Sequence, residues 1–111
     1  MNETIIKKRA LRTDFHEKED GTAVMNFEGW FDTTASIQAT RDMEKLQNLL
    51  DRNIVLDLTG LRYISSSGLR LFLSLLKDTR AHGGSVSITG ASEYIRSVFE
   101  QTGFDNFFKI Q

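Results

Sequence analysis

The segment that decides the fold is residues 57–69, which reads Asp-Leu-Thr-Gly-Leu-Arg-Tyr-Ile-Ser-Ser-Ser-Gly-Leu. The pattern predicts that a buried strand ends at Asp57 and that an amphipathic helix then opens on Ser65, Ser66 and Ser67. One hydroxyl is enough to cap a helix. Three at a helix start favour a site that handles phosphate, because a helix N-terminus presents free N–H groups and the positive end of its dipole.

Upstream of this segment the sequence predicts a β-hairpin followed by a helix. Residues 19–21, Glu-Asp-Gly, are a turn signal between a loosely patterned strand within residues 4–15 and a strand over residues 22–30. The second strand alternates apolar and polar side chains, as a half-buried strand does. A helix over residues 34–50, capped by Thr33 or Thr34, carries one apolar stripe made of Ala35, Ala39, Met43, Leu46 and Leu50.

Downstream of the hairpin and helix, strands and helices alternate. Residues 54–58 predict a central strand buried on both faces. A helix over residues 66–82 ends at Gly83-Gly84, and its apolar stripe is Leu69, Phe72, Leu73, Leu76 and Ala81. A strand over residues 85–89 follows. Ser92 caps a short helix that Gly103 terminates, and an aromatic tail supplies a last short strand or extended segment.

This order of elements predicts an α/β domain with a mixed β-sheet and helices packed mainly on one face. The 111 residues allow a single domain, residues 1–111, with a real core. The net charge is −1 with scattered Lys and Arg, which argues against a nucleic-acid partner. Nothing at the N-terminus resembles a signal peptide and no apolar run is long enough to span a bilayer, so we expect a cytoplasmic protein without a membrane partner.

A serine hydrolase is the sharpest alternative for the three serines, and the residues disfavour it. Ile64 stands where a nucleophile elbow would have its first glycine. The chain has no cysteine and two histidines, His16 and His82. His82 is at the far end of the predicted helix, roughly 24 Å from Ser66. We therefore expect no catalytic residue, no metal site and no cofactor.

Two acids could accompany the serines. Asp57 closes the predicted central strand, and Asp32 follows the strand over residues 22–30. Each is explained by itself as a capping or turn acid, yet both could approach the serine run. Trp30 and Phe31 precede Asp32, and an exposed aromatic at a loop is a common anchor for a protein partner.

The pattern resembles the STAS domain, the family of anti-sigma-factor antagonists and of the cytoplasmic domains of sulfate transporters. The resemblance rests on Asp-Leu-Thr at residues 57–59 with Ser-Ser-Ser-Gly-Leu at residues 65–69. Residues 27–32, the glycine pair at 83–84 and the Val-Phe and Gly-Phe pairs near the end also match, so the similarity covers residues 22–110.

The resemblance implies a non-enzymatic antagonist whose partner is an anti-sigma factor that is also a serine kinase, with a serine phosphatase as a further partner. Ser66 takes the phosphoacceptor position, with Ser65 and Ser67 as alternatives, and ATP and magnesium would belong to the kinase. The implied partner-binding residues are Asp32, Asp57, Ser65, Ser67 and Gly68. Ser65 replaces the aspartate that precedes the acceptor in the family, which removes a charge. The alternative is a STAS scaffold or a subunit of a signalling or transporter complex, with serines that only cap the helix.

Overall fold

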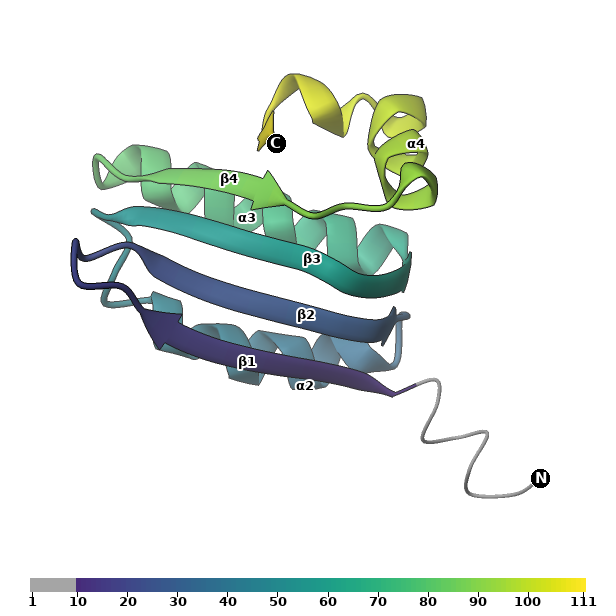
Figure 1. Cartoon of the computed structure of the whole chain (residues 1–111), viewed down its shortest axis with the longest axis horizontal. Helices are drawn as coiled ribbons and strands as arrows, with labels where there is room; N and C mark the ends of the chain where they lie inside the picture. The colour runs from purple at the N-terminus through teal and green to yellow at the C-terminus, as the bar shows by residue number, and fades with distance from the viewer. Residues whose placement is uncertain (1–9) are drawn as a thin grey trace.

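The computed structural model describes residues 10–111, which form one mixed sheet with helices packed behind it (Figure 1). Five strands lie across the sheet in chain order: β1 (Leu11–Glu17), β2 (Ala23–Phe31), β3 (Asn53–Ile64), β4 (Ser85–Thr89) and β5 (Lys109–Ile110). The helices are α2 (Ala35–Asp42), α3 (Ser66–Ala81) and α4 (Glu93–Thr102), with the short 3₁₀ turns η1 (Met43–Leu46) and η2 (Phe104–Asn106).

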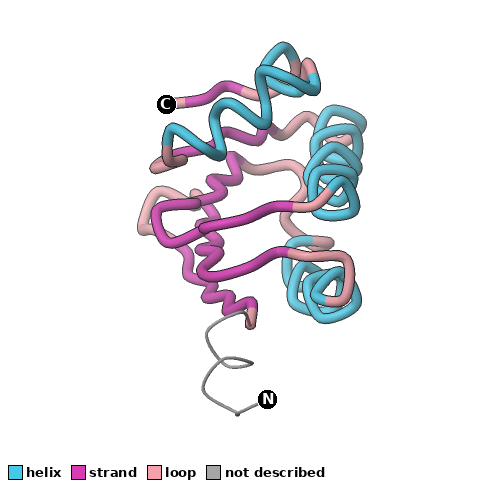
Figure 2. The backbone as a smooth tube through the Cα atoms, turned by 90° about the vertical axis from the view of Figure 1, so that its right-hand side faces the viewer, coloured by secondary structure: helices cyan, strands magenta, loops and turns pink. Residues whose placement is uncertain are grey.

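The direction of the strands explains where the helices lie. β1 pairs with β2 antiparallel, and every later neighbour is parallel. Each later parallel strand is added at the same edge of the sheet. Because the crossover connections between such strands are right-handed, they all pass over the same face, and the connecting helices lie on that face. Figure 2 shows α2 and α3 on that face, and Figure 1 shows α4 beyond β4. The predicted α/β fold with a mixed sheet and helices mainly on one face is confirmed.

The first two strands form the predicted hairpin. Lys18 N–H donates to the Thr22 carbonyl at 2.8 Å, and Gly21 takes a φ of +90° that a side chain would disfavour. The Thr22 N–H donates to Asp20 Oδ1 at 2.9 Å and holds the pKa of that carboxyl below its usual value. β1 begins at Leu11 and ends at Glu17, later than predicted, and residues 4–9 of the predicted range lie outside the described residues.

β3 corrects the prediction for the central strand. It runs from Asn53 to Ile64 instead of ending near Asp57, and its burial alternates instead of being complete on both faces. Leu56 is fully buried against the helices, whereas Val55 and Asp57 are half-buried on the opposite face. The reason is that α2 and α3 cover one face only, so the second face of β3 meets solvent.

Two irregularities explain how β3 continues past Asp57. The register against β2 shifts between Asn26 and Glu28 and again between Gly29 and Trp30. Asp57 Oδ1 accepts hydrogen bonds from the Thr59 N–H at 3.0 Å and from Thr59 Oγ1 at 2.6 Å. These local bonds hold a bulge, in which a strand gains a residue and bends without stopping.

The helix predicted over residues 34–50 is shorter than expected. α2 ends at Asp42, and the chain then tightens into η1 and two further turns. Gln47 N–H donates to the Glu44 carbonyl at 3.1 Å and Leu49 N–H to the Leu46 carbonyl at 3.0 Å, which are three-residue spacings. The predicted stripe is still buried, apart from the half-buried first residue; its buried members are Ala39, Met43, Leu46 and Leu50.

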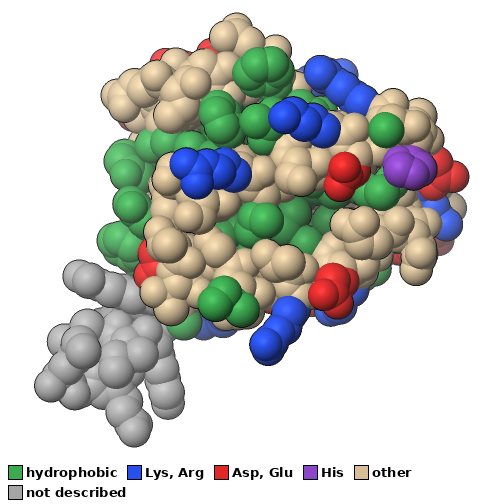
Figure 3. Space-filling view, turned by 180° about the vertical axis from the view of Figure 1, so that it is seen from behind, with side chains coloured by type: hydrophobic (Ala, Val, Ile, Leu, Met, Phe, Trp, Pro, Cys, Tyr) green, Lys and Arg blue, Asp and Glu red, His purple; other side chains and the backbone are tan. Residues whose placement is uncertain are grey.

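An aromatic cluster joins α3 to the sheet. The Phe72 ring meets the Phe27 ring edge-on at 5.1 Å and the Phe31 ring at 5.6 Å, and all three are fully buried. The prediction for this helix face is partly wrong, because Leu75 is buried where Leu73 was expected and the predicted end of the stripe at residue 81 is exposed. Figure 3, from behind, shows hydrophobic side chains reaching the surface among the Lys and Arg side chains of this helix-covered side.

The C-terminal elements follow the predicted signals. Ser92 caps α4 by accepting the Ile95 N–H at 3.2 Å, and Gly103 ends the helix with a φ of +78°. The Phe99 and Phe108 rings pack with centroids 6.1 Å apart, which ties α4 to the end of the chain. Phe107 is 47% exposed. The last strand is confirmed as a short one, pairing with Ser87 and Ile88 of β4.

The two leucines predicted as core give a direct test of this packing. Leu56→Ala should lower the free energy of unfolding by about 2–5 kcal/mol, because its side chain is fully buried and its truncation leaves a cavity in the core. Leu73→Ala should cost clearly less, because Leu73 is half-buried at the rim of the core. Urea unfolding of both variants measures the difference, and equal losses would contradict the placement of α3.

Candidate functional site

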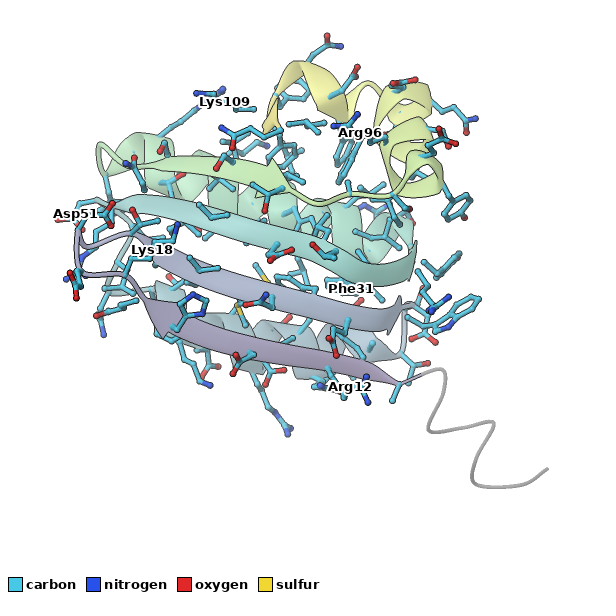
Figure 4. The ribbon with its side chains drawn as sticks, viewed as in Figure 1. Arg12, Lys18, Phe31, Asp51, Arg96 and Lys109 are labelled. Atoms are coloured by element: carbon cyan, nitrogen blue, oxygen red, sulfur yellow. The ribbon has the colours of Figure 1, made fainter. Side chains whose placement is uncertain are left out.

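The site forms where β2 and β3 end side by side. Phe31 and Ile64 are partners in the parallel register, so the chain leaves both strands at the same edge of the sheet. The Ser65 N–H donates to the Phe31 carbonyl at 2.8 Å. This bond fixes the start of the serine run against the residue that precedes Asp32. Figure 4 shows Phe31 at this end of the sheet.

Ser65 is the N-cap of α3. Its backbone is extended, with φ −86° and ψ 169°, and its Oγ accepts the Gly68 N–H at 3.2 Å. Its own carbonyl accepts the Leu69 N–H at 3.0 Å, the first bond of the helix. Ser65 is only 7% exposed. A capping hydroxyl in this environment has a structural task and is poorly accessible to another protein.

Ser66 is the first residue of α3 and is exposed. Within residues 10–111 its hydroxyl makes no hydrogen bond, so it points to solvent without a structural duty. Ser67 is half-buried beside it. Of the three serines predicted as phosphoacceptors, Ser66 therefore presents the most accessible hydroxyl, at a helix end whose dipole favours negative charge.

Gly68 permits the close approach of α3 to the sheet. A Cβ atom built on it would lie 2.9 Å from Ile64 Cγ1 and 3.0 Å from two atoms of the Phe31 ring. Such contacts are too short for a side chain, and the residue is buried. Gly68 thus keeps the serines in place through packing. Its predicted role in partner binding is untested, as is that of Ser65.

Asp32 holds the start of α2 beside the serines. Its Oδ1 accepts the Ala35 N–H at 2.8 Å, and its carbonyl accepts the Ser36 hydroxyl at 3.4 Å. The predicted cap by Thr33 or Thr34 is wrong, since Thr34 makes no side-chain cap bond and the aspartate does this work instead. Asp32 directly follows Phe31, whose carbonyl accepts the Ser65 N–H, so it leaves the sheet at the end where the serine run begins. Its predicted place beside the Ser66 hydroxyl stays a prediction.

Asp57 lies elsewhere, and its predicted place near Ser66 is wrong. It pairs with Asn26 in the middle of the sheet, five residues of β2 before Phe31. At about 3.3 Å per residue, that separation is roughly 17 Å. Asn26 Nδ2 donates to Asp57 Oδ2 at 3.1 Å, and Asp57 is on the less buried side of β3. The Asp57 carboxylate accepts hydrogen bonds from Asn26 and Thr59. The rest of β3 lies between Asp57 and the serines.

The arrangement offers no catalytic set within the described residues. His82 lies at the C-cap of α3, where its Nδ1 contacts the Asp78 carbonyl at 2.8 Å, and His16 lies on β1. No group of three or more His, Cys, Asp or Glu residues in residues 10–111 could hold a metal ion. In the same part of the chain, no helix has the length and apolarity needed to cross a membrane.

The sequence model of the STAS domain matches residues 16–111. The chain belongs to the STAS domain family. A relative from Bordetella bronchiseptica, BtrV, carries the name of an anti-sigma factor antagonist. It is 31% identical over 94 residues, which are 85% of this chain and 81% of the relative. The resemblance seen in the serine run and its surroundings is confirmed.

Solved structures share the STAS fold. An anti-sigma factor antagonist from Mycobacterium paratuberculosis superposes with a TM-score of 0.81 and 16% identity, over 92% of this chain and 86% of that one. SpoIIAA, an anti-sigma factor antagonist solved in its unphosphorylated form, gives 0.73 and 20% over 90% and 88%. At these identities the likeness establishes the fold, and the mixed sheet with helices is that of the family.

Several residues of this STAS site were missed by reasoning from the sequence. The Phe31 carbonyl, which holds Ser65, carries no signal in its residue type. Arg70 is exposed one helical turn after Ser66, on the same side of α3, and its i, i+4 spacing could have revealed it. Of the two aromatics proposed as anchors, Phe31 is fully buried, whereas Trp30 is half-buried and stacks on Tyr63 at 5.3 Å.

Neighbouring serines should respond differently to truncation. Ser65→Ala should lower the free energy of unfolding by about 0.5–2 kcal/mol, because it removes the cap of α3. Ser66→Ala should leave stability almost unchanged, because its hydroxyl is exposed and unbonded within the described chain. Ser65→Asp, which restores a capping oxygen, is the control and should regain most of the loss. Urea midpoints give the answer, and an equal loss for both alanine variants would contradict the division of roles.

Proposed function

We propose that this STAS protein is an anti-sigma factor antagonist that binds an anti-sigma factor with serine kinase activity and is switched by phosphorylation of Ser66. It acts as a binding protein and not as an enzyme. ATP and magnesium belong to the kinase, and a serine phosphatase restores the active form. The observation that carries the proposal is the exposed hydroxyl of Ser66, the first residue of α3, which makes no hydrogen bond within residues 10–111. The Ser65 cap and the Phe31 carbonyl hold this end of the helix in place.

The physics of the site fits a reversible switch. A phosphate adds about −1.5 to −2 charges and three strong acceptor oxygens. At the start of α3 it meets the positive end of the helix dipole, and Arg70 lies one turn further on. The domain can therefore carry the phosphate without unfolding. A partner surface shaped for a neutral hydroxyl would instead lose affinity through desolvation and repulsion.

The serine before the acceptor adjusts the switch. Family members have an aspartate at the position of Ser65, and the Ser65 hydroxyl supplies the cap without the charge. With one carboxylate fewer, an added phosphate at Ser66 meets less like-charge repulsion within the domain. The kinase then has to recognise the acceptor through other features. Asp32 is one candidate, because it directly follows the residue whose carbonyl accepts the Ser65 N–H.

A scaffold role is the second candidate, and one likeness favours it. The fold also superposes on part of SLC26A9, with a TM-score of 0.65 and 9% identity over 93% of this chain and 22% of that one. A STAS fold thus occurs as one part of a larger protein, where the serines need only cap a helix. Phosphorylation of Ser66 separates the two candidates, because only the switch needs the exposed hydroxyl.

The phosphorylation prediction is tested on protein purified from its native cells. Mass spectrometry should locate a phosphate on Ser66. The Ser66→Ala variant should lack this phosphate and should still bind the partner. Ser66→Asp should weaken partner binding, because it places a negative charge against a partner surface that fits a neutral hydroxyl. Ser67→Ala is the matched control and should still be labelled by the kinase. Equal labelling of Ser66→Ala and the unaltered protein would overturn the assignment.

Phosphorylation should change binding far more than stability. We expect the free energy of unfolding to move by no more than about 1 kcal/mol, the size of one charge effect at a helix end. Thermal melts of the phosphorylated and unmodified proteins, paired with partner binding for each, measure both quantities. A large loss of stability would mean that the modified group is buried, and the surface switch would fail.

A further inference from the structure

Among the described strands, β1 lies at the edge of the sheet, and its hydrogen-bond ladder with β2 is unbroken. The Trp30 N–H donates to the Ala10 carbonyl and the Lys18 N–H to the Thr22 carbonyl, so the even-numbered residues of this segment bond to β2. Because the bonding direction alternates along an antiparallel strand, Leu11, Thr13 and Phe15 point their backbone groups away from the sheet. The pairing with β2 has no register shift, and the chain has no proline to blunt this edge.

The sequence of β1 is complementary to itself about Thr13. If a second β1 lies antiparallel with Thr13 opposite Thr13, then Arg12 faces Asp14 of the other copy, and Leu11 faces Phe15. The charged pair lies on the open face of the sheet, and the apolar pair lies on the helix side. Opposite charges and apolar pairs directly across two strands are stabilising. A two-fold axis repeats each contact, so every favourable pair occurs twice.

The registers shifted towards the end of β1 are unfavourable. Centring the pair on Asp14 brings the two Asp14 carboxylates together, and centring it on Phe15 sets Arg12 against Lys18. Like charges opposite each other destabilise strand pairing. The register on Thr13 also uses the outward backbone groups correctly, since Thr13 can exchange both of its hydrogen bonds with its copy. Among the pairings centred on Thr13, Asp14 and Phe15, charge and backbone geometry therefore favour the one centred on Thr13.

The helices leave room for this pairing. α2 packs on both β1 and β2, so its axis lies above the gap between these two strands. The two-fold axis of the pair lies midway between the two β1 strands, which is about one strand spacing from the α2 axis. The two α2 helices would then lie roughly 10 Å apart, an ordinary distance for packed helices. Gln38 of α2 donates to the Leu11 carbonyl at 3.0 Å, and that oxygen keeps a second lone pair for the other copy. Phe15, now half-buried, would be covered.

We propose that the protein forms a symmetric homodimer in which two β1 strands pair antiparallel about Thr13 and join the two sheets. The occupant of this edge is a second copy of the chain, selected by the Arg12–Asp14 complementarity. Figure 4 shows Arg12 at this edge. The proposal is independent of the switch at Ser66, because no residue of the serine run takes part.

Two charge reversals and their mixture test the dimer. Sedimentation equilibrium of the full chain should show a mass that rises with concentration towards twice that of the monomer. Asp14→Arg places arginines opposite each other, and Arg12→Glu places acids opposite each other. Each variant alone should raise the dissociation constant about tenfold or more. Mixing the two variants should restore the dimer, because the glutamate introduced in one copy then faces the arginine introduced in the other.

The controls separate a lost interface from a lost fold. Arg80→Glu and Asp78→Arg reverse exposed charges on α3 and should leave the dimer unchanged. Circular dichroism shows whether each variant is folded, and the mixing experiment needs no comparison with unaltered protein. Hydrogen exchange of the Thr13 amide should slow as concentration rises. A chain that stays monomeric at millimolar concentration, or a dimer insensitive to both reversals, would overturn the proposal. If the protein forms the dimer but Ser66 is not phosphorylated, the dimer proposal stands and only the proposed switch fails.

Discussion

The site depends on Phe31, the last residue of β2. Its ring is fully buried, stacks near Phe27 at 5.8 Å and meets Phe72 of α3 edge-on. Its carbonyl accepts the Ser65 N–H, and the absence of a side chain at Gly68 lets α3 approach the ring. One residue therefore anchors the sheet, the helix and the cap together. The position of the exposed hydroxyl follows from this packing and not from the serines themselves.

The parts of the fold that the sequence predicted are those in which one physical signal acts alone. Alternation along β2 predicted the buried positions Ala23, Met25 and Phe27, although Val24 on the other face is buried as well. Glycines marked the ends of α3 and α4. The end of β3 could not be predicted in this way. Asp57 resembles a turn acid, but the Thr59 hydroxyl and N–H satisfy it inside a bulge, so the strand continues. Bulges depend on the neighbouring strand, which a local pattern does not contain.

The candidate site was predictable in residue type but not in the division of roles. Helical spacing alone left any of three serines as the cap or the acceptor. The hydrogen bond from Gly68 N–H to Ser65 Oγ shows that Ser65 is the cap, and Ser66, the next residue, is exposed. Local spacing also gave the wrong prediction for Leu73. Its position fits an apolar stripe, but α3 is rotated about its axis so that Leu75 is buried instead. A helix's rotation is set by what it packs on.

The antiparallel hairpin fixes where the serine site lies relative to the outer edge of β1. Leu11 pairs with Gly29, so β1 begins at the end of the sheet where β2 and β3 deliver Ser65. In a pair of copies joined about Thr13, Leu11 of one copy faces Phe15 of the other, so the two serine sites lie towards opposite ends of the joined ladder.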